Sequence, residues 1–184
     1  MSSIRIFILA ALEERGPLHG HQLRLLAEAE EEHVGLWTDI TVGGLYGAIK
    51  RLAAEDLIEE IRVERAGCCP QRQVWAVTNA GREAAGALCL RALREIVVKP
   101  DPFDLAITRL HPDHLDDLPT IIAARIGSLN AMLTEWETHA ATIGRYLTAA
   151  ERLVMKHRAD RLRAEIAWHE ELSEALPGIV LDET

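Results

Sequence analysis

Apolar residues in the first third of the chain recur every three or four positions, which is the spacing of amphipathic helices. Three such segments follow one another, and Gly16 with Pro17 separates the first from the second. The second is expected over 19–32, and the third begins after Thr41, whose hydroxyl suits a helix N-cap. The residues predicted to face inward are Ile4, Ile8, Ala11 and Leu12, then Leu23, Leu26 and Ala27, then Leu45, Ile49 and Leu52.

The period of the pattern then changes from about 3.6 to 2. Ile61 and Val63 alternate with charged residues, which predicts a strand with one buried face. Residues 73–78 are rich in β-formers and predict a second strand, and 66–71 between them predict a turn. Three helices followed by a β-hairpin is the order of a winged helix-turn-helix, so the expected class is mainly α.

A long helix is expected over 79–98, and the two prolines of the segment 99–102 then break the chain. This break is the clearest boundary in the sequence. We therefore expect residues 1–98 to form a winged-helix DNA-binding domain with a linking helix. Residues 99–184 are expected to form a helical domain for dimerisation and effector binding.

The second domain carries a regular heptad pattern. A last helix with the same alternation is expected to end at Pro177. Two long apolar stripes can pack on each other or on a second copy of the chain, and a twofold dimer is the commonest closed assembly. The expected coiled-coil-like dimer seam, whose residues alternate by 4 and 3, is Ile122, Ile126, Leu129, Leu133, Trp136 and Ile143, with Ala140 and Leu147 continuing the pattern.

Composition excludes several classes of protein. The chain has 184 residues, of which 48% are hydrophobic, and this fraction argues against disorder. Since no run of 18 apolar residues occurs, no membrane span is predicted. The apolar run 6–12 is short and lacks a basic leader, so a signal peptide is not expected and the cytoplasm is the expected location.

The net charge of −9 gives no support for binding to DNA, which requires lysine and arginine. The acid is unevenly distributed, however. Residues 99–184 carry 9 Lys/Arg against 15 Asp/Glu, a net charge of −6. Residues 41–82, which include the third helix and the hairpin, carry 6 against 5, a net charge of +1. A local basic face is therefore compatible with the acidic total.

Four segments, taken in order, resemble the PadR-like transcriptional regulators. They are 18–23 with its His19-Gly20 pair, 40–52 with its Leu45-Tyr46 pair and following basic residues, the wing region 67–81, and the pair of segments 101–103 and 161–168. The chain departs from the family pattern at three positions. The residues are His21 in place of the usual Tyr, Gly44 in place of Ser or Thr, and Cys69 in place of a wing Arg.

The resemblance implies a homodimeric repressor of double-stranded operator DNA, with the third helix in the major groove and the wing beside it. Lys50 and Arg51 are the expected base or phosphate contacts, and Tyr46 offers a hydroxyl to phosphate. Gly43 and Gly44 either allow a phosphate to approach the backbone or tighten the turn. The remaining candidate contacts are Thr41, Gln71 and Arg72.

The resemblance also implies release of DNA on binding a small molecule, in the family often a phenolic acid or a planar hydrophobic compound. Trp168 lies one position off the last apolar stripe and is the expected ligand contact, with His157 and Arg161 on the same helix. Trp136 lies on the stripe itself, which favours core packing.

Other functions have weaker support. No P-loop, dinucleotide fingerprint, HExxH or nucleophile elbow occurs, so an enzyme is not expected, and neither a cofactor nor a metal is predicted. A winged-helix module that binds a protein partner instead of DNA is one alternative, which the negative charge favours. A redox or metal sensor that uses Cys68 and Cys69 is the other.

Overall fold

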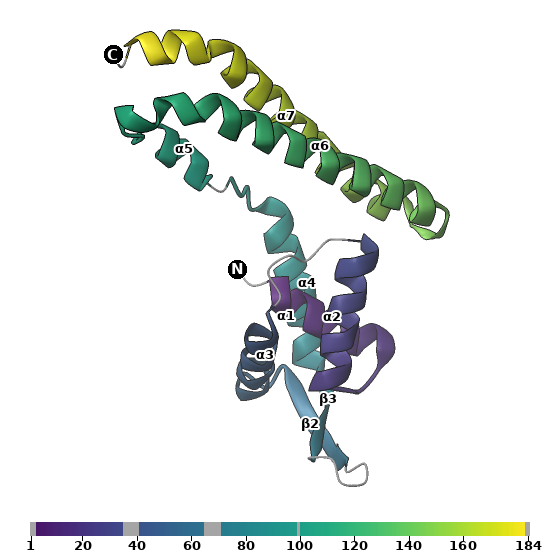
Figure 1. Cartoon of the computed structure of the whole chain (residues 1–184). Coiled ribbons are helices and arrows are strands. Elements are labelled where there is room, and N and C mark those ends of the chain that lie inside the picture. Colours follow the sequence, from purple (N-terminus) through teal and green to yellow (C-terminus); the bar gives the residue numbers. More distant parts are fainter. Residues whose placement is uncertain (1–2, 35–40, 65–70, 99, 183–184) are drawn as a thin grey trace. The chain divides into compact units, whose positions relative to one another are not determined.

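The computed structural model describes residues 3–34, 41–64, 71–98 and 100–182 of the chain. The chain divides into two compact units, Met1–Val97 and Val98–Thr184. The elements of the first unit are α1 (Ser3–Arg15), β1 (Leu18–His19), α2 (Gly20–Val34), α3 (Val42–Ala54), β2 (Ile58–Glu64), β3 (Arg72–Val77) and α4 (Asn79–Arg94) (Figure 1). Those of the second are α5 (Pro102–Ile107), a 3₁₀ helix (Pro112–Asp117), α6 (Leu118–Ile143), a short 3₁₀ helix (Gly144–Tyr146) and α7 (Ala149–Asp182).

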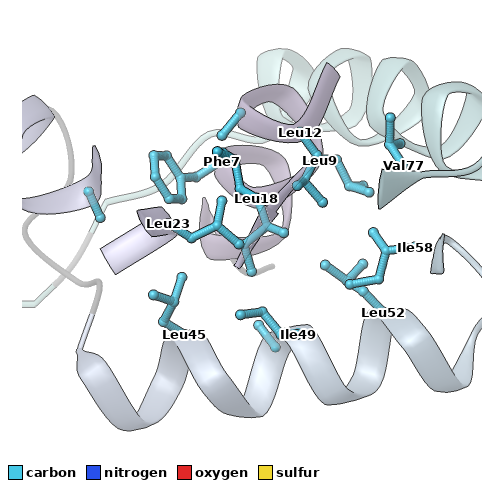
Figure 2. Packing of buried hydrophobic residues seen from close by; sticks show 14 of the residues in the cluster. Phe7, Leu9, Leu12, Leu18, Leu23, Leu45, Ile49, Leu52, Ile58 and Val77 are labelled. Carbon is cyan, nitrogen blue, oxygen red and sulfur yellow. The ribbon is translucent and has the colours of Figure 1, made fainter. Parts of the chain in front are cut away.

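The first unit is a winged helix, as the sequence predicted. Gly16 ends α1 with a positive φ of 77°, a conformation that glycine adopts readily. Leu45, Ile49 and Leu52 of α3 are buried and point toward residues of α1 and α2 (Figure 2). The three predicted inward faces therefore form one core, whose members also include Phe7, Leu9, Leu18, Ile58 and Val77.

The sheet has three antiparallel strands in the order β1-β3-β2, so β3 is central. The third strand, β1, was not predicted, because its two residues are too few to show alternation. It pairs Leu18 with Trp75 and His19 with Val74. This pairing fixes the beginning of α2 beside the central strand.

The prediction that Ile61 and Val63 are buried is wrong. Strand β2 forms as expected, but these side chains are 42% and 48% exposed, and only Ile58 at its start is buried. In the described part of the sheet β2 lies at the edge, and its register with β3 shifts between Glu60 and Arg62. An irregularity of this kind bends a strand, and residues 59–63 of β2 are all exposed.

Helix α4 begins at a capped turn. The Thr78 hydroxyl accepts a hydrogen bond from the Gly81 amide at 3.0 Å and lies 2.8 Å from the Asp56 carbonyl, to which it donates. The Thr78 amide also donates to the Leu57 carbonyl at 3.1 Å. These bonds join α4 to the turn between α3 and β2.

Two predicted helix ends are wrong. Helix α4 ends at Arg94 and not at residue 98, because residues 96–98 are three successive β-branched side chains that disfavour helix. Helix α7 continues through Pro177 to Asp182. A proline removes one backbone donor, but the turn before it is held by Leu176, which is buried against α6.

In the second unit α6 and α7 lie side by side as an antiparallel pair (Figure 1). Three of the residues assigned to a dimer seam make contacts within the chain. Ile122 and Ile126 belong to one cluster with Leu176, and the Trp136 indole donates to the Met155 carbonyl at 2.9 Å. At these three residues the stripe marked by the heptad spacing packs on α7 of the same chain. None of the described helices is long and apolar enough to cross a membrane.

Candidate nucleic-acid interface

Helix α3 has one buried and one exposed face. Gly43, Tyr46 and Lys50 lie three or four positions apart, share one side of the helix and are exposed. The opposite side, which carries Leu45 and Ile49, is buried. Because the core fixes the buried side, the exposed side is held rigidly as a row of small, aromatic and basic groups.

Thr41 caps α3 as predicted, and its hydroxyl accepts a hydrogen bond from the Gly44 amide at 3.1 Å. The two glycines after it differ. A methyl group at Gly43 would meet nothing within 4 Å, whereas one at Gly44 would lie 2.9 Å from the Thr41 hydroxyl and 3.1 Å from Ile4. Gly44 therefore has a packing role, and Gly43 leaves the helix start open to an approaching group.

Tyr46 is positioned by the residue that begins α2. A methyl group at Gly20 would lie 2.6 Å from the Tyr46 ring, so the ring rests directly against the backbone there. The exposed part of the side chain remains available to an outside partner. The contact links the His19-Gly20 pair with the Leu45-Tyr46 pair, two segments that the resemblance had treated separately.

Lys50 and Arg51 are both exposed on the last turns of α3. The Arg51 guanidinium lies near the helix surface, 3.4 Å from the position that a methyl group on Gly47 would take. Glu55, which follows α3, is paired with Arg5. The Arg5 hydrogen bond lowers the pKa of Glu55, and the positive charge of Arg51 adds to this effect.

In the wing, Arg72 begins β3 and is half-buried, and Gln71 just before it is exposed. Arg72 reaches toward His19, whose ring Nε2 lies 3.5 Å from the arginine Nη1. The sequence pattern did not single out His19 as a site residue. The signal available in the sequence was that Gln22 follows His19 by three residues, the spacing of a capping box at a helix start. Cys68 and Cys69 lie outside the described residues.

The effector candidates occupy one exposed side of α7. His157, Arg161 and Trp168 follow helical spacing, and all three are exposed. Trp168 is 41% exposed and makes an edge contact with Phe103 of α5, with 5.8 Å between the ring centres. The Arg125 guanidinium lies 4.2 Å from the centre of the same Phe103 ring.

A separate hollow of about 260 Å³ lies between α6 and α7. It is lined by Trp136 and not by Trp168, His157 or Arg161. Trp136 therefore borders a cavity although its indole is bonded within the core.

Comparison with known proteins agrees with this fold. The Bacillus subtilis PadR structure in complex with operator DNA has a TM-score of 0.72 at 16% identity, over 95% of this chain and 99% of that one. The Bacillus subtilis PadR structure in complex with p-coumaric acid gives 0.71 at 16% identity, over 95% and 98%. The virulence activator AphA of Vibrio cholerae gives 0.65 at 16% identity, over 96% and 99%. At these identities the likeness shows the fold.

A search of curated protein sequences found no match. The sequence profile of the transcriptional regulator PadR-like family, however, matches residues 8–87. That range runs from the middle of α1 into α4 and includes α3 and both strands of the wing. The winged-helix unit of this chain is therefore similar to the PadR-like family of transcriptional regulators over residues 8–87.

Proposed function

We propose that this chain is a dimeric transcriptional repressor that binds operator DNA and releases it when a small planar aromatic molecule binds. Residues 1–98 would bind DNA, and residues 99–184 would carry the dimer contact and the effector site. The observation that carries the proposal is the exposed row Gly43, Tyr46 and Lys50 on a helix whose other side is fixed in the core.

In the bound state α3 would lie in the major groove. Lys50 and Arg51 would contact base edges or phosphates, while Thr41, Gly43 and Tyr46 at the start of the helix would contact the backbone. Gln71 and Arg72 would contact phosphates from the wing. The structure of Bacillus subtilis PadR with operator DNA supports this arrangement, because that protein has the same fold.

Fluorescence anisotropy with a labelled duplex from the region upstream of the reading frame tests the proposal. We expect Lys50→Ala to weaken binding by about tenfold, since a side-chain contact to DNA contributes about 1–3 kcal/mol. Arg91→Ala, which removes an exposed arginine on α4, is the matched control and should bind as the wild type does. Affinity should also fall steeply with salt, because phosphate binding releases counterions. Absent or salt-insensitive binding would contradict the proposal and favour a protein partner.

The effector would be a planar aromatic acid that binds at the exposed side of α7. Trp168 and Phe103 offer aromatic surfaces, and Arg125 beside Phe103 offers a cation for a carboxylate. Arg161 and His157 lie about two and three turns away from Trp168 on the same side of the helix. The structure of Bacillus subtilis PadR with p-coumaric acid supports this class of compound.

The same anisotropy titration, repeated with p-coumaric acid, tests the effector. We expect the compound to weaken DNA binding 5- to 150-fold, the usual range of allosteric coupling. Trp168→Ala should abolish the response, whereas Trp136→Phe, at the separate hollow, should retain it. An unchanged affinity in the wild type would count against this class of effector.

The dimer would form along the outer face of α6. Ile121, Leu129 and Met132 line an open groove of about 500 Å³ there, and Ile121 and Met132 are among the exposed large apolar residues. Since α7 already packs on Ile122 and Ile126 of the predicted seam, this groove, which includes the seam residue Leu129, offers an apolar surface of α6 to a second copy.

We expect Met132→Glu to convert a dimer into a monomer, because two like charges would meet near the twofold axis. Sedimentation velocity measures the change directly. Asn130→Glu, at a nearby exposed position outside the groove lining, is the control and should remain dimeric. A wild-type chain that sediments as a monomer would contradict the proposed dimer.

A further inference from the structure

His19 holds the first turn of α2 with an uncommon cap. Its backbone N–H donates to the side-chain oxygen of Gln22 at 3.0 Å, and the Gln22 N–H donates to His19 Nδ1 at 3.1 Å. The two bonds reproduce the reciprocal pattern of a capping box, with an imidazole in place of a hydroxyl. The side chain is held firmly, since His19 is only 8% exposed.

The cap determines where the imidazole carries its hydrogen. Nδ1 accepts a hydrogen bond from an amide, so it has no hydrogen of its own, and the neutral ring must then carry its hydrogen on Nε2. The group that faces Nε2 at 3.5 Å is the Arg72 guanidinium, which has no acceptor atom. Two donors thus face each other without an acceptor between them.

The surroundings of this pair suit an anion. Among the described residues, no hydrogen bond or ion pair joins an acidic side chain to His19 or Arg72. The His21 ring is stacked on His19, with 6.1 Å between their centres. The residue after His19, Gly20, has the ring of Tyr46 from α3 resting against its backbone. The pair therefore joins the start of β3 to the start of α2, which the ring of Tyr46 contacts at Gly20.

We propose that the His19 Nε2–H and the Arg72 guanidinium together bind one phosphate of the DNA backbone. The inference rests on the proposed function, because it assigns a contact within the same DNA-binding surface. The phosphate oxygen supplies the acceptor that the two donors lack. The contact would fix the start of α2, and through Gly20 also Tyr46, against the backbone while α3 lies in the groove.

His19→Asn tests the proposal, because the Asn side-chain oxygen can still accept from the Gln22 amide and keep the cap. The Nε2–H is lost. We expect operator affinity to fall about tenfold, the effect of losing one hydrogen bond to a charged group. Gln22→Ala is the matched control, since it removes half of the cap but leaves the Nε2–H in place. It should bind within about twofold of the wild type.

Arg72→Ala should also weaken binding and should lower the salt slope by about one, whereas His19→Asn should leave that slope unchanged. If both groups hold the same phosphate, the double variant should lose less affinity than the product of the two single losses. Losses that simply multiply, or wild-type affinity in His19→Asn, would overturn the inference. If the wild-type chain binds no DNA, the proposed function fails first.

A measurement on the wild-type chain tests the inference without depending on whether any variant folds. Operator DNA should shift the imidazole ¹⁵N resonance of Nε2 in His19 and leave that of Nδ1 in place. A spectrum in which neither nitrogen responds would overturn the inference independently of any variant.

Discussion

Gly81→Ala should unfold the winged-helix unit at a markedly lower urea concentration than the wild type. A methyl group at Gly81 would lie 2.0 Å from the Leu57 carbonyl oxygen and 2.8 Å from Val77, so it cannot be accommodated without moving backbone. Any shift that relieves this clash also breaks the bonds that Thr78 makes to the turn before β2. We expect a loss of about 3 kcal/mol, at the upper end for overpacked cores.

Gly86→Ala provides the control on the same helix. A methyl group at Gly86 meets nothing within 4 Å, so this variant should gain up to about 1 kcal/mol from helix propensity. Urea titrations followed by far-ultraviolet circular dichroism compare the two. Equal unfolding midpoints for Gly81→Ala and Gly86→Ala would show that the close approach of α4 to the Leu57 carbonyl is not tight.

His169→Ala should cause the second large loss of stability, in this case in the C-terminal unit. The ring is 1% exposed, and its Nδ1–H donates to the Glu165 carbonyl at 2.8 Å. Its Nε2 accepts from Arg125 Nε at 2.8 Å, which joins α7 to α6. Removal would leave a cavity and a partly buried arginine without this acceptor, so we expect a loss of about 2–4 kcal/mol.

His157→Ala is the control for this variant, since it removes an exposed histidine from the same helix. Its effect should remain within about 0.5 kcal/mol of the wild type. Tryptophan fluorescence during urea unfolding reports on the unit through Trp168, which touches His169. If the two variants unfolded at the same urea concentration, the hydrogen bond between α6 and α7 would contribute little.

The winged helix could be predicted well because its signals are local. The Thr41 cap and the buried side of α3 follow from residue type and spacing alone. Strand β1 could not be found in this way, because Leu18 and His19 become a strand only by pairing with β3. The cap on α2 had only its capping-box spacing to Gln22 as a signal, since histidine is not among the usual N-cap residues.

Periodicity indicated which residues share a face but not what covers that face. The heptad stripe through Ile122 and Trp136 was correct as a pattern, yet its partner is α7 of the same chain. Ile61 and Val63 do alternate, but their side of β2 has no covering layer among the described elements. The continuation of α7 past Pro177 depends in the same way on the packing of Leu176.

The edge position of β2 bears on how the protein behaves at high concentration. A strand with an open edge and exposed apolar side chains such as Ile61 and Val63 is a template for aggregation. The same strand also exposes three charged side chains, Glu59, Glu60 and Arg62. Charged side chains on an edge strand discourage pairing between molecules. Replacing these charges during engineering of the wing would remove that protection, so soluble yield should be monitored alongside affinity in any such variant.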